Sequence, residues 1–191
     1  ADLARDEEAH HQYPRWWLTR LRRAYRDDWM AIAAAGNKPP PMTLRVNLRR
    51  GTVADYLARL EAVGLSARPV GRSGLILEKA ISVEALPGFL EGSVSVQDAG
   101  AQRAVELLVP VPGSRVLDAC AAPGGKTAHL LESTELDLLA LDIDAGRTKR
   151  IDENVQRLGL RATVKTADCS KADLWWDGRP FDAILADVPC S

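Results

Sequence analysis

The residues best placed for chemistry form the stretch 115–127, which reads RVLDACAAPGGKT. Its apolar first part predicts a buried strand, and the small residues that follow predict a tight turn into a helix. Gly124 and Gly125 let the backbone approach a ligand closely, and a helix start presents free N–H groups and the positive end of its dipole. A carboxylate or phosphate could bind there. For this stretch alone, an ordinary turn between a strand and a helix is also a credible interpretation.

Carboxylates recur where the apolar runs of the second half of the chain end. Asp142 ends the run LLALDID about 20 residues further on, where an acid receives ribose hydroxyls in nucleoside-binding α/β sheets. It could instead cap the next helix, a role that Asp144 could also serve. The complete set of strand-end carboxylates is Asp118, Asp142, Asp168 and Asp187. One such residue is usually a loop or capping residue, but parallel strands end at one sheet edge, so the set favours a ligand site there.

The elements that must position these residues alternate between helix and buried strand from Asp98 onward. A predicted helix, DAGAQRAVELL, ends at the turn PVPG, and four apolar runs follow with helical segments between them: RVLDA, LLALDID, ATVKTAD and FDAILADVP. This alternation predicts an α/β fold with a parallel sheet and right-handed crossovers. Because the sequence given stops soon after the fourth run, we expect an incomplete sheet of four strands. Its apolar edge predicts marginal solubility or self-association.

Residues 39–97 predict a smaller α+β unit. The run TLRVNL places three apolar residues in alternation with Arg45, Asn47 and Arg49, which is typical of a half-buried strand. Its cationic face could contact RNA or merely solvent, and the two are weighed equally. Thr52 and Asp55 resemble a capping box that opens a helix, and SARPV, LILE and SVSVQ predict further strands.

Residues 1–38 predict a polar linker followed by a helix that begins near Pro14. Apolar residues recur at helical spacing up to Ile32, and Gly36 with the prolines 39–41 ends the helix. Five arginines lie here among aromatic residues: Arg15, Arg20, Arg22, Arg23 and Arg26, with Tyr13, Trp16, Trp17 and Tyr25. The mixture suits phosphate contact and base stacking. Sequence alone favours a simpler interpretation, a helix with a solvated basic side and an aromatic side docked on a core.

Composition excludes several classes of protein. The net charge of −1 over 191 residues argues neither for nor against nucleic acid. No run of about 18 apolar residues could span a bilayer, and no charged and then apolar leader opens the sequence, so we expect a soluble, cytoplasmic protein without a membrane partner. The cysteines lack paired metal-ligand spacing and the three histidines form no constellation, so we expect neither disulfides nor a metal.

The motifs DACAAPGGKT, ALDID, TAD and DVPCS together resemble the Nol/Nop/Sun family of RNA cytosine-5 methyltransferases, most closely its bacterial Sun (Fmu) branch, which modifies 16S ribosomal RNA. The upstream segments YPRWWLTRL, PPPMTLRVN and LPGFLEGSVSVQDAGAQ also resemble that branch, so the resemblance runs nearly from end to end. It implies a linker and N-terminal helix over 1–38, an RNA-binding subdomain over 39–97, and an incomplete Rossmann-like class I methyltransferase domain over 98–191. The implied cofactor is S-adenosylmethionine, and the implied partner is small-subunit ribosomal RNA.

The resemblance also implies roles for the residues at the sheet edge. The loop from Cys120 to Lys126 would wrap the methionine end of the cofactor, and Asp142 would take the ribose hydroxyls. Asp168 would lie on the adenine side, and Asp187 between the cofactor and the target base. The expected cofactor-binding residues are Cys120, Ala121, Ala122, Pro123, Gly124, Gly125, Lys126, Asp142, Asp168 and Asp187. Lys126 could also be a catalytic residue or form a surface ion pair, and its neighbours favour the site.

The reaction requires a cysteine, because carbon 5 of cytosine is too electron-poor to attack a methyl sulfonium until a thiolate adds to carbon 6. From the residues alone Cys190, after Pro189, is the candidate nucleophile, or else an inert buried thiol. The family places the attacking cysteine in a later Thr-Cys motif and gives the Pro-Cys cysteine a role in product release. By resemblance Cys190 is the release residue, and the sequence as given, which has no Thr-Cys motif, is expected to be inactive. We expect the intact enzyme to be a monomer.

Two other functions fit the same residues. The chain could be a non-catalytic RNA-binding module with a vestigial nucleotide pocket. It could also be a methyltransferase acting on protein or DNA with Cys190 as its nucleophile. Affinity for the cofactor separates the first alternative from the enzyme, and a covalent adduct through Cys190 would support the second.

Overall fold

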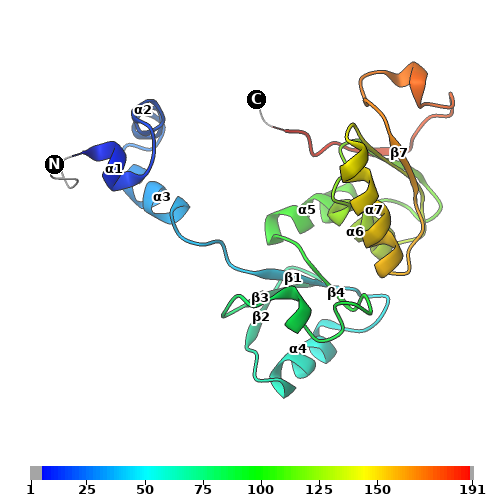
Figure 1. Cartoon of the computed structure of the whole chain (residues 1–191), viewed down its shortest axis with the longest axis horizontal. Coiled ribbons are helices and arrows are strands. Elements are labelled where there is room, and N and C mark those ends of the chain that lie inside the picture. The colour runs from blue at the N-terminus through cyan, green and yellow to red at the C-terminus, as the bar shows by residue number, and fades with distance from the viewer. Residues whose placement is uncertain (1–5, 190–191) are drawn as a thin grey trace. The chain divides into compact units, whose positions relative to one another are not determined.

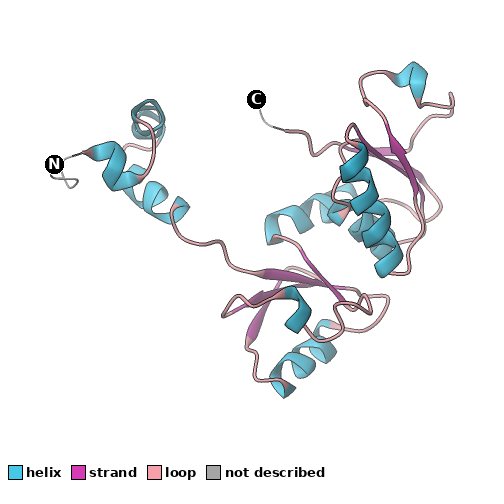
Figure 2. Cartoon of the chain, in the orientation of Figure 1, coloured by secondary structure: helices cyan, strands magenta, loops and turns pink. Residues whose placement is uncertain are grey.

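The structure is a computed structural model that describes residues 6–189 of the chain. The chain divides into two compact units, with the boundary between Pro40 and Pro41. Figures 1 and 2 show the helices and strands of both units. No helix in the described range is long and apolar enough to cross a membrane.

The first unit consists of short helices, α1 (Glu7–His11), α2 (Arg15–Ala24) and α3 (Trp29–Gly36). The expectation of one continuous helix from Pro14 is wrong, because Tyr25 leaves the helical conformation (φ −133°, ψ 70°) and a turn separates α2 from α3. The stretch expected to be a linker contains α1, whose first backbone N–H groups are capped by the Asp6 carboxylate.

The aromatic residues of this unit largely pack against one another. Tyr13 stacks on Trp17 with ring centroids 4.2 Å apart, and the Arg22 guanidinium lies 4.0 Å above the ring of Trp29. Internal packing therefore accounts for only part of the basic and aromatic pattern. Trp16 remains 62% exposed, and contact of this unit with RNA stays a prediction.

The second unit begins with an antiparallel sheet in the order β2-β3-β1-β4. Its elements are β1 (Thr43–Val46), α4 (Val53–Ala62), β2 (Ala67–Val70), β3 (Gly74–Leu77), the 3₁₀ turn η2 (Val83–Ala85) and β4 (Val94–Val96). The predicted capping box is confirmed, since the Thr52 hydroxyl accepts from Asp55 N and the Asp55 carboxylate accepts from Thr52 N.

This sheet is covered on both faces. Leu44 and Leu75 pack with Tyr56 and Leu60 of α4 in one apolar cluster, while β1 also contacts the helix α5. All of β1 is therefore buried, Arg45 included. The sequence predicted that the Arg45 side chain faces either RNA or solvent, and both predictions are wrong. Helix α5 and the elements after it cover the polar face of this strand.

The chain continues into a parallel sheet in the order β7-β6-β5-β8. Its elements are α5 (Ala99–Leu108), β5 (Arg115–Asp118), α6 (Gly125–Ser133), β6 (Asp137–Asp142), α7 (Ala145–Arg157), β7 (Thr163–Thr166), the 3₁₀ turn η3 (Ala172–Leu174) and β8 (Ala183–Leu185). The predicted α/β class and its four parallel strands are confirmed.

The parallel sheet has apolar residues on both faces because its strands are buried between layers. Residues of α5, α6 and α7 pack with Val116, Leu138 and Ala140 in the larger cluster, and Figure 1 shows these helices grouped beside the sheet. A smaller cluster contains Leu117, Leu139 and Trp175, the last from the segment before β8. It also contains Ala119 and Leu141, which lie at the carboxyl ends of β5 and β6.

Candidate functional site

The carboxyl ends of the parallel strands are joined by backbone hydrogen bonds. Ala119 N donates to O of Leu185, the last residue of β8 (2.9 Å), and Ala121 N donates to Leu141 O of β6 (2.8 Å). Ala167 N, just after β7, donates to Asp142 O (2.9 Å). The loop 119–124 between β5 and α6 therefore lies across this edge of the sheet, where the sequence predicted a ligand site.

Gly124 ends this loop and is the N-cap of α6. Its φ of +96° is a conformation that L side chains rarely adopt, and a Cβ there would lie 3.1 Å from the Cα of Ile151 in α7. Gly124 N donates to Ala121 O at 2.7 Å, which closes the turn. A glycine at this position thus lets the loop turn into α6 while α6 packs closely on α7.

Asp142 fixes the other side of the loop. Its Oδ2 accepts from Ala122 N (3.1 Å), and its Oδ1 accepts from Asp144 N (3.2 Å). The Arg147 guanidinium lies 3.4 Å from Oδ1 and donates to Ala122 O at 3.0 Å. Asp144 caps α7 through Arg147 N, so capping does not explain the Asp142 carboxylate.

Asp118 is almost fully buried, with 1% of its surface exposed. Its Oδ2 accepts from the Thr127 hydroxyl at 2.6 Å, and its Oδ1 has no partner among the described residues. Burial raises the pKa of Asp118 to about 6, although the hydrogen bond from Thr127 and the charge of Lys126 oppose the rise. The unpartnered oxygen marks a place where a donor is missing.

Lys126 and Asp187 form an ion pair at the same edge. The lysine side chain is largely buried, at 18% exposure, whereas the Asp187 side chain is 60% exposed. The expected ion pair of Lys126 is confirmed, and its place in the active site stays a prediction.

Asp168 and the cysteines complete the edge. Asp168 accepts from the backbone N (3.0 Å) and hydroxyl (2.7 Å) of Ser170, and these bonds lower its pKa. Burial, followed by the charges of Asp168 and Cys120, raises the pKa of Cys169, which indicates that Cys169 lies near both groups. Cys190 lies outside the described residues.

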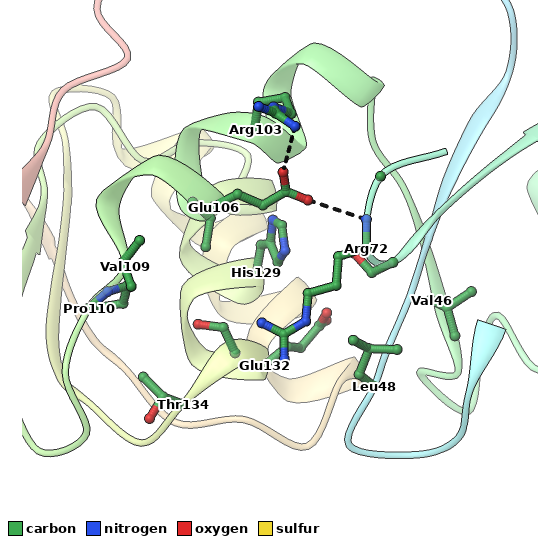
Figure 3. A pocket seen from close by; sticks show the side chains of 14 residues that line it. Val46, Leu48, Arg72, Arg103, Glu106, Val109, Pro110, His129, Glu132 and Thr134 are labelled. Carbon is green, nitrogen blue, oxygen red and sulfur yellow. Dashed lines mark hydrogen bonds and ion pairs between the residues drawn. The ribbon is translucent and has the colours of Figure 1, made fainter. Parts of the chain in front are cut away.

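A cavity lies elsewhere in the second unit. It has a volume of about 540 Å³ and lies between the antiparallel sheet and helices α5 and α6 (Figure 3). Neither this cavity nor a smaller one of about 260 Å³ beside α5 is lined by the strand-end carboxylates. The candidate site at the sheet edge is thus defined by contacts between the loop and the strand ends.

Some residues at the edge were not singled out from sequence. Arg147 pairs with Asp142, and Thr127 donates to Asp118. The sequence could have indicated Thr127. It lies in the first turn of α6, where a hydroxyl can face back toward the strand before the glycine loop. No sequence signal separates Arg147 from the other arginines of α7.

An open parallel sheet with a glycine loop after β5 and a carboxylate ending β6 is the arrangement of a Rossmann-like fold, the class to which many methyltransferases belong. The structure is similar over 100% of this chain to a methyltransferase homolog protein from Pyrococcus horikoshii, at 29% identity and a TM-score of 0.86, with 64% of that chain covered. It also resembles the crystal structure of NSun6 from Pyrococcus horikoshii with SFG, at 16% identity, a TM-score of 0.82, and coverage of 93% of this chain and 71% of that one, which shows the fold alone.

Two family models match the chain. Residues 105–191 match the model described as 16S rRNA methyltransferase RsmB/F, and residues 13–84 match the ferredoxin-like domain of the same group. Ribosomal RNA small subunit methyltransferase B of Pseudomonas syringae pv. tomato is 47% identical over 100% of this chain and 43% of its own length. The corresponding protein of Xylella fastidiosa is 49% identical over 94% of this chain and 42% of its own.

The chain therefore belongs to the RsmB/F family of 16S rRNA methyltransferases, which confirms the family expected from its motifs. It spans less than half the length of the curated relatives it matches.

Proposed function

We propose that this chain carries the S-adenosylmethionine site of an enzyme that methylates carbon 5 of a cytosine in 16S ribosomal RNA. The family membership supports RNA methylation, since the relatives are named as small-subunit rRNA methyltransferases. The observation that carries the cofactor assignment is the loop 119–124, held between β5 and the Asp142 carboxylate at the sheet edge.

The described residues fit the chemistry of this cofactor. The start of α6 suits a carboxylate, as helix N-termini do, and the unpartnered Oδ1 of Asp118 suits an ammonium donor. The Asp142 carboxylate suits the ribose diol. When bound, the cofactor supplies an electrophilic methyl group on a sulfonium. The residues that would hold it are those of the loop Cys120 to Lys126 with Asp142, Asp168 and Asp187.

Ribose hydroxyls can reach Asp142 only if a neighbouring side chain moves. Its side chain has no exposed surface, whereas the Arg147 side chain that contacts it is about half exposed, at 47%. The Arg147 contact at 3.4 Å is long for a hydrogen bond, so it gives way more easily than the bond from Ala122 N. We expect Arg147 to shift and the loop contact to stay when ribose hydroxyls bind.

The target base and the cysteine roles rest on the family resemblance. Asp187 would lie between cofactor and base, and a carboxylate there can accept from the amino group of cytosine. Its ion pair with Lys126 would hold it in place. Cys190 would assist product release, with the attacking cysteine in a Thr-Cys motif that this sequence does not contain.

Recognition of the RNA is assigned to residues 39–97 together with the basic helices before them. The domain arrangement that goes with this assignment is 1–38, 39–97 and 98–191. Exposed side chains on these segments that suit RNA include Trp16, Tyr25 and Arg49. Small-subunit ribosomal RNA is therefore the proposed partner.

Calorimetry with S-adenosylhomocysteine tests the cofactor assignment. We expect the chain to bind it, and Asp142→Asn to weaken binding at least about tenfold, because a hydrogen bond to a charged group contributes about 1.5–3 kcal/mol. The matched control is Asp137→Asn, at the opposite end of β6. Folded wild-type protein that releases no heat would instead favour the non-catalytic RNA-binding module.

A further inference from the structure

The cavity between the antiparallel sheet and helices α5 and α6 is separate from the sheet edge. Val46 and Leu48 line it on one side, and Val109 and Pro110 lie on the opposite side (Figure 3). His129 of α6 lies between these two apolar walls. Leu48 and Val109 are 41% and 71% exposed, so the walls reach the surface and leave the cavity open to a ligand.

His129 lines this cavity, and its ring carries one buried polar atom without a partner among the described residues. The residue is 8% exposed, and its Nδ1 has no hydrogen-bond partner within residues 6–189. This nitrogen has almost no accessible surface, so a ligand in the cavity would pack on the exposed part of the ring and would not bond to Nδ1. Burial, and then the charges of Arg45 and Arg72, lower the pKa of His129 to about 3. The ring is therefore neutral near pH 7, and it lies in a positive potential.

Arg72 is a cation of this cavity that has no ion-pair partner among the described residues. Glu132 is neutralised by a bidentate contact with Arg45 (2.8 and 2.9 Å), and Glu106 lies 3.3 Å from Arg103. The Arg72 guanidinium forms no ion pair with any described residue, and Figure 3 shows it in front of Glu132 and beside His129. The mouth of the cavity thus carries a guanidinium that is free to meet an anion.

We infer that this cavity binds a nucleoside monophosphate unit, with its phosphate on Arg72 and its base between the apolar walls, against His129. Guanidinium groups recognise phosphate well, and the flat base suits two facing apolar surfaces with one polar ring between them. The volume lies in the range of about 300–1,000 Å³ found for small-ligand sites.

An RNA origin for this unit rests on the proposed function. The cofactor loop lies at the start of α6, whereas Glu132 of the cavity lies near its end. The two sites are therefore about 10 Å apart along the helix, at 1.5 Å per residue. A nucleotide in the cavity is then a different one from the base that is methylated, and the site would help to place the RNA.

Histidine-selective NMR tests the inference directly, because His10, His11 and His129 are the three histidines of the chain. We expect millimolar cytidine or adenosine monophosphate to shift the His129 signals and leave the other two in place. Arg72→Ala should weaken this binding about tenfold or more. The control Arg68→Ala changes an exposed arginine of β2 outside the cavity and should not.

Further titrations separate the possible outcomes. Inorganic phosphate that shifts His129 as well as the nucleotides do would overturn a nucleotide site, as would equal losses in Arg72→Ala and Arg68→Ala. No shift with any nucleotide would also overturn it and would favour a polypeptide segment as the occupant. A single-stranded oligoribonucleotide that binds more tightly than the mononucleotides identifies RNA as the source, and weaker binding identifies a free nucleotide.

Titration of the same samples with S-adenosylhomocysteine keeps this inference distinct from the proposed function. We expect Arg72→Ala to retain its affinity for that ligand. Loss of cofactor binding with an intact His129 response would overturn the proposed function alone, whereas the reverse result would overturn the cavity assignment alone.

Discussion

Asp118 shows how one buried carboxylate makes stability depend on pH. Its pKa is raised from 3.8 to about 6 in the folded chain, so between these values the folded state binds more protons than the unfolded state. Stability therefore falls as pH rises from about 4 to about 6 and is then constant. The shift corresponds to at most about 3 kcal/mol.

Asp118→Asn should remove this dependence. Relative to wild type, we expect the variant to gain stability between pH 4.5 and pH 7, by up to about 3 kcal/mol, as measured by urea unfolding. Asn can still accept from Thr127, so the local hydrogen bond is kept. Parallel pH profiles for the variant and wild type would show that the carboxylate is not desolvated.

Gly124 offers a second test at the level of the residue. Gly124→Ala combines a positive φ with a close approach to Ile151, whereas Gly113→Ala has a positive φ and nothing within 4 Å of the new Cβ. Each should lose about 1 kcal/mol for the backbone, and Gly124→Ala should lose more and bind S-adenosylhomocysteine less well. Equal losses of stability, with cofactor binding unchanged, would contradict the role given to this turn.

At the scale of elements, Arg45 joins the antiparallel sheet to both ends of α6. From β1 it donates to Glu132 at 2.8 and 2.9 Å, to Gln97 at 2.6 Å and to Gly125 O at 2.8 Å. The guanidinium and the Glu132 carboxylate are almost fully buried. Because Gly125 O and Glu132 lie at opposite ends of α6, this contact fixes the helix that starts at the cofactor loop.

Arg45→Met should destabilise the chain by about 3–5 kcal/mol, because it leaves a buried carboxylate without its partner. Changing both partners, in Arg45→Met with Glu132→Leu, should recover much of the loss. Urea unfolding of the two single variants and the double variant measures the coupling. Additive losses would mean that the pair is not an energetic unit.

The same arginine shows what a sequence can predict. The capping box at Thr52 depends on residues three positions apart, and the strand-end aspartates follow from the apolar runs that precede them; both are local signals. Arg45 meets Glu132 across 87 positions. An alternating strand pattern cannot distinguish a solvated face from one that holds a buried ion pair, so the exposure of Arg45 was predicted wrongly.

The break between α2 and α3 was missed for a related reason. Apolar spacing continues through Tyr25 and Trp29, yet Tyr25 leaves the helical conformation, and Leu18 of α2 and Ala33 of α3 are both fully buried in the folded unit. Spacing along the sequence does not show such a turn between two short helices. Arg147 was missed because its role depends on the tip of β6, which only the fold brings near.

At the scale of the whole molecule, β8 is an edge strand. It pairs with β5 and with no other described strand, and Ile184 in its middle is 55% exposed. An apolar edge of this kind favours pairing between copies. We expect the isolated chain to self-associate at high concentration in sedimentation experiments, and Ile184→Lys to reduce the association. A monodisperse wild-type monomer would contradict this expectation.

The most direct measurement of the central claim is a crystal structure of the chain with S-adenosylhomocysteine. We expect the ligand to lie along the loop Cys120 to Lys126, with its ribose hydroxyls on Asp142 and the Arg147 side chain displaced. Ligand density in the cavity beside His129, or ribose hydroxyls away from Asp142, would contradict it.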